Sequence, residues 1–107
     1  MNEFTLGGYM ATHDRAAAFT GSDQLPYSVA LWIDDEPDDR GRYGAALLFV
    51  RWTAAGDTPD GHLESGYLAW GSTVEDARER LGALSLYDVK AILDELIAAR
   101  LAPPEDD

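Results

Sequence analysis

The apolar residues of this chain change their spacing at Gly71. Before that point they follow the two-residue repeat of a strand or form a short continuous run, and after it they recur every three or four residues. Side chains alternate between two faces along a strand, whereas residues three and four apart share one face of a helix. The sequence therefore predicts strands first and helices last, which places the fold in the α+β class.

The clearest strand pattern is Tyr27–Ile33, in which four large apolar residues alternate with other residue types. A second strand is predicted over Ala45–Thr53, because it begins with six consecutive apolar residues, as is typical of a central strand. Further strand patterns occur at Phe4–Ala11, Ala16–Thr20 and Leu63–Trp70. Short loops between these segments favour an antiparallel meander of three to four strands.

Two C-terminal helices are predicted, at about Thr73–Leu81 and Leu86–Leu101, each with one apolar stripe. We expect both helices to pack on one face of the sheet, within a single α+β domain over residues 1–102. A short acidic tail is predicted at residues 103–107, after a pair of prolines. The core is expected to contain Val29, Leu31, Leu48, Val50, Val74, Leu81, Leu86, Val89, Leu93 and Leu96.

The charge balance constrains the partners of the chain. Its 20 Asp and Glu residues outnumber its eight Lys and Arg residues, giving a formal net charge of −12. Nucleic-acid phosphates and anionic membranes repel such a surface, so we expect neither direct nucleic-acid binding nor membrane binding. The chain has no Cys, which excludes disulfides and thiolate chemistry. With no basic-apolar leader and no long apolar run, a cytoplasmic location is expected, and the preference for Arg over Lys is typical of a GC-rich bacterial genome.

Three side chains are candidates for a metal site. His62 and Glu64 are two residues apart in a predicted strand and therefore share a face. Together with His13 they would supply two imidazoles and one carboxylate, the ligand set of a non-haem iron site. Nothing in the spacing brings His13 near the other two, so an exposed His and Glu at a strand edge is the simpler interpretation.

Other chemistry has little support in the sequence. The acidic loop over Asp34–Asp39 does not follow the spacing of an EF-hand and is interpreted as a solvated loop. Neither a phosphate-binding glycine loop nor the G-x-S-x-G motif of serine hydrolases occurs. The sequence predicts no catalytic residue and no cofactor.

An apolar patch is predicted on the face of the sheet that the helices leave open. Trp32 alternates with the apolar residues of its strand, so it should point away from the core. If Arg51 faces outward in the next strand, Leu47 and Phe49 share that face and form an interface patch with Trp32. In the alternative, the N-terminal strand or its loop covers this face.

These observations favour a small acidic, non-enzymatic module that binds or regulates another protein. One alternative is an acidic mimic or inhibitor that occupies a basic site on a partner. A less favoured alternative is a small metal-dependent enzyme that uses the two histidines and Glu64. The predicted apolar patch also leads us to expect a homodimer that pairs through the open sheet face.

Overall fold

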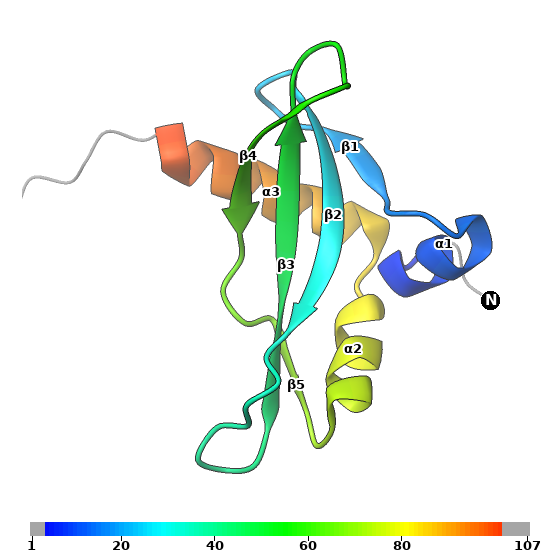
Figure 1. Cartoon of the computed structure of the whole chain (residues 1–107), viewed down its shortest axis with the longest axis vertical. Coiled ribbons are helices and arrows are strands. Elements are labelled where there is room, and N and C mark those ends of the chain that lie inside the picture. The colour runs from blue at the N-terminus through cyan, green and yellow to red at the C-terminus, as the bar shows by residue number, and fades with distance from the viewer. Residues whose placement is uncertain (1–3, 102–107) are drawn as a thin grey trace, which may run out of the picture.

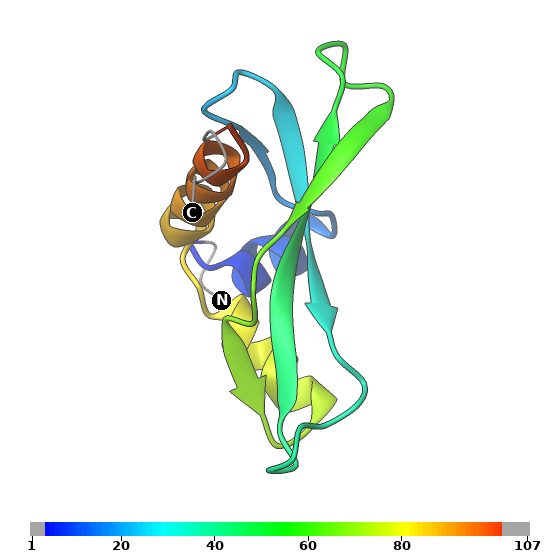
Figure 2. The ribbon, with the colours of Figure 1, turned by 90° about the vertical axis from the view of Figure 1, so that its left-hand side faces the viewer.

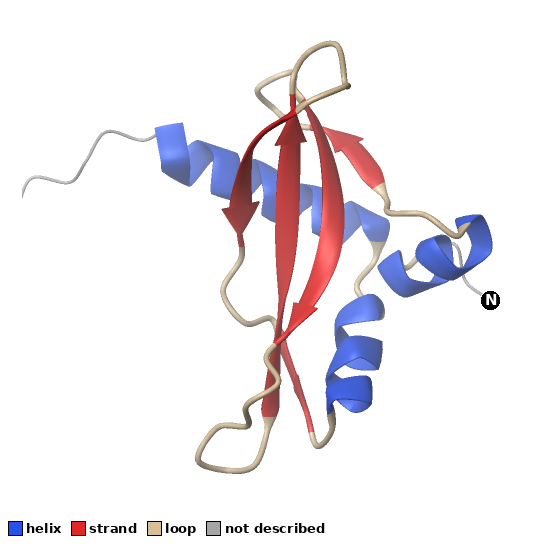
Figure 3. Ribbon diagram, in the orientation of Figure 1, coloured by secondary structure: helices blue, strands red, loops and turns tan. Residues whose placement is uncertain are grey.

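The computed structural model describes residues 4–101, so the predicted tail at residues 103–107 lies outside the described part of the chain. Within these residues a short helix precedes an antiparallel meander with one additional strand, and two helices follow (Figures 1 and 3). The elements are α1 Leu6–His13, β1 Ala18–Thr20, β2 Pro26–Ile33, β3 Tyr43–Trp52, β4 Pro59–Glu64, β5 Ala69–Gly71, α2 Val74–Gly82 and α3 Leu86–Leu101. The predicted α+β class, with a meander followed by two helices, is confirmed.

The sheet is built around the long antiparallel pair of β2 and β3 (Figure 1). These strands are neighbours, as the sequence predicts, and their register runs from Tyr27 opposite Arg51 to Ile33 opposite Ala45. β1 extends the sheet beside β2, and β4 extends it on the far side of β3. β5 pairs with the first residues of β3, on the same side as β4. The long central strand β3 therefore determines which side chains face which side of the sheet.

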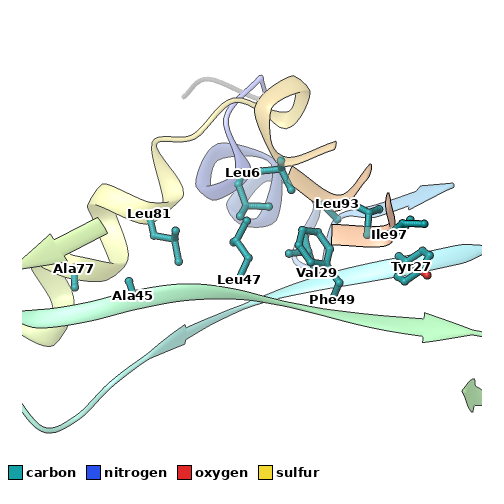
Figure 4. Close-up of a cluster of buried hydrophobic side chains, with 12 residues drawn as sticks. Leu6, Tyr27, Val29, Ala45, Leu47, Phe49, Ala77, Leu81, Leu93 and Ile97 are labelled. Carbon is teal, nitrogen blue, oxygen red and sulfur yellow. The ribbon is translucent and has the colours of Figure 1, made fainter. Parts of the chain in front are cut away.

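All three helices contribute to one hydrophobic core on a single face of the sheet, here called the inner face. Figure 2 shows α3 standing on one side of the twisted sheet, and Figure 4 shows strand side chains pointing toward the helices. The fully or almost fully buried apolar residues are Leu6, Ala17, Tyr27, Val29, Ala45, Leu47, Phe49, Ala77, Leu81, Val89, Leu93 and Ile97. Burying a Leu, Val, Ile or Phe side chain stabilises the fold by about 1.5–3 kcal/mol relative to leaving it exposed, so the large members of this cluster make a substantial contribution to stability.

Hydroxyl caps begin the two C-terminal helices, α3 at its predicted first residue and α2 one residue later than predicted. Thr73 caps α2, because its Oγ1 accepts a hydrogen bond of 2.9 Å from the Asp76 backbone N–H. The Ser85 hydroxyl accepts a bond of 3.0 Å from the Asp88 N–H at the start of α3. None of the helices in residues 4–101 is long and apolar enough to cross a membrane.

The strand predicted over Phe4–Ala11 is wrong, because this segment forms α1. Thr5 caps the helix by accepting a hydrogen bond from the Gly8 N–H at 3.1 Å. The backbone of Leu6 then donates to the carbonyl of Leu84, which fastens α1 to the connection between α2 and α3. Leu6 is fully buried in the inner core. In the described part of the chain, which begins at residue 4, this segment therefore packs with the helices and does not cover the opposite face of the sheet.

The strand predicted over Leu63–Trp70 is interrupted and becomes β4 and β5. The Ser65 hydroxyl accepts a bond of 2.9 Å from the Leu47 N–H, and the Ser65 N–H donates to the Leu47 carbonyl at 3.0 Å. The Leu68 N–H donates to the Ala45 carbonyl at 2.8 Å. These contacts hold the irregular segment 65–68 beside β3 while it lies outside the regular ladder.

Candidate functional site

The face of the sheet that points away from the helices, here called the outer face, is the candidate functional surface. Cross-strand partners in an antiparallel sheet share a face, so the register assigns its residues. Trp32 pairs with Ala46, and Leu48 pairs with both Ala30 and Glu64. No helix covers this face in the part of the chain that the structure describes (Figure 2). The outer face therefore includes the strand residues Ser28, Ala30, Trp32, Ala46, Leu48, Val50, His62 and Glu64. Trp52 lies on the same face, because its indole N–H donates a hydrogen bond of 3.0 Å to the Ser28 hydroxyl.

Trp32 lies on the open face, as the sequence predicts, and half of its surface is exposed, at 50%. The placement predicted for Leu47, Phe49 and Arg51 is wrong. Leu47 and Phe49 are fully buried in the inner core, where they pair with Leu31 and Val29. Because the side-chain repeat of a strand is two residues, choosing the wrong parity for one strand moves all its side chains to the opposite face.

The same parity error also placed two outer-face residues of β3 in the predicted core. Leu48 and Val50 are predicted in the core and instead lie half-buried on the outer face. Arg51 lies on the inner side at the end of the sheet, where its Nε donates a bond of 3.0 Å to the Asp60 carbonyl. Its guanidinium is also 3.8 Å from the Asp60 carboxylate. Arg51 thus belongs to a local contact with β4 and is not part of an open patch.

Three aromatic side chains, here called the aromatic row, lie together on the outer face. The rings of Trp32 and Tyr67 are nearly parallel, with 6.2 Å between their centroids and 4° between their planes. Tyr67 meets Trp70 edge to face at 6.3 Å. Tyr67 and Trp70 are 44% and 40% exposed, respectively. Large aromatic rings that are this exposed and this close are unusual on a protein surface that has no partner.

The irregular segment 65–68 brings Tyr67 to the aromatic row. Its ring lies over Gly44 of β3, where an added Cβ atom would come within 2.8 Å of the ring. Gly44 therefore leaves the space that the tyrosine ring occupies. The Tyr67 hydroxyl donates a hydrogen bond of 2.6 Å to the Asp34 carboxylate at the end of β2. Tyr67 is thus fixed at both its ring and its hydroxyl.

This hydrogen bond changes the acidity of both partners. The Tyr67 hydroxyl, together with the Glu36 N–H at 3.0 Å, lowers the pKa of the Asp34 carboxyl. The same bond raises the pKa of Tyr67, because an ionised phenol would lose this hydrogen bond and would also place a second negative charge beside Asp34. At neutral pH the pair is therefore a neutral phenol donating to a carboxylate.

A groove of about 530 Å³ runs beside Trp32 on the outer face. Ala46 and Leu48 form part of its apolar lining, while Trp32 and Tyr67 contribute aromatic rings. Glu64 also lines the groove, and its side chain is largely exposed. The arrangement combines an apolar surface, aromatic rings and a carboxylate, which suits a ligand that has both an apolar part and a positive charge.

Arg42 shows how the aromatic row interacts with a cation. Its guanidinium carbon lies over the Trp70 ring, 5.6 Å from the ring centroid. The same guanidinium pairs with the Asp38 carboxylate at 3.1 Å. Several hydrogen bonds from Arg42 and Arg40, chiefly those from backbone amides, lower the pKa of the Asp38 carboxyl. One end of this surface therefore already holds a cation that stacks on an aromatic ring and pairs with a carboxylate.

The metal candidates are only partly brought together. His62 and Glu64 are neighbours on β4, with His62 Nε2 3.6 Å from Glu64 Oε1. His13 ends α1, where its ring packs on Tyr9 with 4.4 Å between centroids. Among residues 4–101, no group of three or more His, Cys, Asp or Glu side chains is arranged to hold a metal ion. The three-ligand set is therefore not assembled in the described chain.

Tyr67 and Trp70 are not predicted as surface residues from the sequence, because they fall within one continuous predicted strand. A signal is present, since Ser65 and Gly66 interrupt that strand and the two aromatic residues Tyr67 and Trp70 follow within four positions. No protein-family model matches this chain, and no curated protein or solved structure resembles it significantly.

Proposed function

We propose that this chain is a protein-binding module that docks a basic segment of another protein on its outer face. The observation that carries the proposal is the exposed aromatic row on a sheet face that no described helix covers. Exposed apolar patches of this kind mark association sites, and Trp and Tyr are enriched among the residues that dominate binding energy. A catalytic role would not require these exposed rings, whereas a docking role uses them directly.

The charge of the chain supports a basic partner. With a net charge of −12, the protein attracts cationic segments over a long range and speeds their association. Two copies of the chain would instead repel one another. The strand residues of the outer face carry little charge apart from Glu64 and its neighbour His62, so removing water from its centre costs little. Attraction at long range and an apolar contact at short range thus favour the same partner.

The proposal can be tested by selecting from a random peptide library on the immobilised full chain. We expect enrichment of peptides that contain both basic and apolar residues. They should bind the variant Tyr87→Ser, which changes a tyrosine on α3 that is 83% exposed, as they bind the wild type. They should lose most of their affinity for Trp32→Ser. Circular dichroism and urea unfolding would confirm that both variants are folded.

Two outcomes would overturn the proposal. Selected peptides that bind Trp32→Ser as tightly as the wild type would place the contact elsewhere, as expected for an acidic mimic whose carboxylates make the contact. A wild-type protein that forms dimers at micromolar concentration in sedimentation equilibrium, with Trp32→Ser monomeric, would assign the outer face to a second copy of the chain. Monomeric behaviour of both proteins, with loss of peptide binding only in Trp32→Ser, supports the proposal.

A further inference from the structure

We infer that the groove beside Trp32 holds an arginine side chain of the bound partner. This inference rests on the proposed docking function and specifies which partner residue the outer face recognises. The groove offers three kinds of surface to a ligand. Ala46 and Leu48 supply an apolar floor, Trp32 supplies an aromatic ring, and Glu64 supplies a carboxylate.

The charge of the groove selects a cation. Among the described residues that line it, Glu64 carries a negative charge and none carries a positive one. Glu64 is held on this face because it pairs with Leu48 across the β3–β4 ladder. Its carboxylate is largely exposed, so it is accessible to a partner. A positive group entering the groove would therefore gain an ion pair without displacing an internal Lys or Arg.

The shape and chemistry of an arginine side chain match this lining. Its three methylene groups can lie along an apolar surface while the charged end stays partly hydrated. The planar guanidinium stacks on aromatic rings and donates paired hydrogen bonds to a carboxylate, whereas a lysine ammonium is a strongly hydrated point charge. The volume of about 530 Å³ exceeds that of one side chain, which leaves room for adjoining residues of the partner.

The protein already uses this mode of contact at the other end of the aromatic row. Arg42 places its guanidinium over Trp70, and the Asp38 carboxylate pairs with the same guanidinium. The groove repeats two parts of this arrangement, an exposed tryptophan and a carboxylate, without an arginine of its own. The structure thus contains an internal example of the contact that we assign to the partner.

The inference can be tested with N-acetylated tri-arginine amide as the probe and N-acetylated tri-citrulline amide as its neutral counterpart. Citrulline retains the planar shape of arginine and lacks its charge. The three tryptophans of the chain give three indole N–H signals in the proton–nitrogen NMR spectrum, which Trp→Phe variants assign. We expect tri-arginine to shift the Trp32 signal at low ionic strength, and tri-citrulline to leave it unchanged.

A matched pair of carboxylate variants completes the test. Glu64→Gln should weaken tri-arginine binding by about two- to fivefold, the range expected for losing one charge partner at an exposed site. Glu95→Gln removes an exposed carboxylate from α3, on the helix side of the molecule, and should leave the affinity nearly unchanged. Because both variants change the net charge equally, a difference between them reports position and not total charge.

Three results would overturn the inference: an equal shift with tri-citrulline, an unchanged affinity in Glu64→Gln, or shifts confined to Trp52 or Trp70. Selected peptides that require Trp32 but contain no arginine would also overturn it, while leaving the proposed docking function intact. If neither tri-arginine nor any selected peptide bound the outer face of the wild type, both proposals would be contradicted. The two failures are therefore distinguishable.

Discussion

The inner and outer faces of the sheet are made by alternate residues of the same strands, yet they differ in what covers them. On the inner face, Val29, Leu47 and Phe49 are fully or almost fully buried beneath three helices. On the outer face, Trp32 and the other rings of the aromatic row remain 40–50% exposed. One covered face is sufficient for an antiparallel sheet to fold, since the other face commonly meets water.

This difference shows which residue types are required for folding and which are not. Folding requires apolar side chains on the inner face, and the core there is closely packed around Leu47 and Phe49 (Figure 4). It does not require an exposed Trp32 beside Tyr67, because polar residues at those positions would satisfy the same backbone. The composition of the outer face therefore points to a function, whereas that of the inner face reflects stability.

Leu47→Ala and Leu48→Ala make the same chemical change at adjacent positions on opposite faces. Leu47→Ala removes a fully buried side chain, so we expect the free energy of unfolding to fall by about 2–5 kcal/mol. Leu48→Ala truncates a half-buried side chain on the outer face, so we expect a loss of about 1 kcal/mol or less. Urea unfolding measures both values.

Leu93→Ala on α3 is a second inner-face variant and should also lose about 2–5 kcal/mol, because Leu93 is fully buried. Equal losses for Leu47→Ala and Leu48→Ala would contradict the assignment of the two faces. A larger loss for Leu48→Ala would show that the register of β3 is shifted by one residue.

Leu47 and Leu48 also show how much of the fold could be predicted from the sequence. The alternation in Tyr27–Ile33 assigns that strand to its faces without ambiguity, and the helix stripes predict α2 and α3 closely. In Ala45–Val50 every residue is apolar, so periodicity cannot distinguish Leu47 from Leu48. Only the pairing of Ile33 with Ala45, which the intervening loop determines, settles the faces of β3. The sequence thus predicted an open apolar face but assigned two buried residues to it.

The remaining errors come from tertiary contacts that no local pattern contains. α1 is fastened by hydrogen bonds to the distant segment 84–86, which a two-residue spacing of apolar residues does not reveal. Tyr67 reaches the outer face because Gly44, far away in the sequence, leaves space for its ring. Contacts between residues that are distant in sequence therefore determined most of the candidate site.

Two glycines of the β3–β5 pair, Gly71 and Gly44, offer a second comparison of the inner and outer faces. A Cβ atom at Gly71 would lie 2.3 Å from the backbone nitrogen of Ala77 in α2, on the inner side. A Cβ atom at Gly44 would instead meet the Tyr67 side chain on the outer side. Because backbone yields less readily than a side chain, we expect Gly71→Ala to cost about 2–3 kcal/mol and Gly44→Ala about 1 kcal/mol.

Thermal unfolding would rank the two glycine variants, and near-ultraviolet circular dichroism would report the aromatic row. Gly44→Ala should change the aromatic signal, because the Tyr67 ring must leave its place over Gly44 and its stacking on Trp32 then changes. An unchanged aromatic signal in Gly44→Ala would show that the Tyr67 ring does not lie over Gly44.

Alkaline pH distinguishes an inner tyrosine from an outer one. Burial, followed by the 2.8 Å hydrogen bond that its hydroxyl donates to Asp23, raises the pKa of Tyr27 above its usual value of 10.0. A raised folded-state pKa stabilises the fold below the unfolded pKa, and this contribution is lost as pH rises through the folded value. We therefore expect stability to fall above pH 10, and Tyr27→Phe to flatten that fall.

Tyr67→Phe is the outer-face counterpart. The pKa of the Tyr67 phenol is also raised, chiefly by the bond to Asp34. Because solvent screens this exposed site, we expect Tyr67→Phe to change the loss of stability at alkaline pH less than Tyr27→Phe does. Urea midpoints between pH 8 and about 11 would compare the two variants. A larger flattening of the pH dependence of stability in Tyr67→Phe than in Tyr27→Phe would contradict this expectation.

Salt should act in opposite directions on folding and on docking. Screening the repulsion among 20 carboxylates should raise the melting temperature by roughly 2–5 °C between low and moderate NaCl. The same screening should weaken the binding of a basic peptide to the outer face. A melting temperature that falls over this range would show that attractive ion pairs, such as Arg80 with Asp76, outweigh the repulsion.

The most direct test of docking on the outer face is hydroxyl-radical footprinting of the full chain, alone and with a basic peptide selected on it. In the unbound protein, Trp32, Tyr67 and Tyr87 should be modified readily, because all three are exposed. We predict that the peptide protects Trp32 and Tyr67 on the outer face and leaves Tyr87 on α3 unchanged. Protection of Tyr87, with Trp32 and Tyr67 modified as before, would contradict docking on this face.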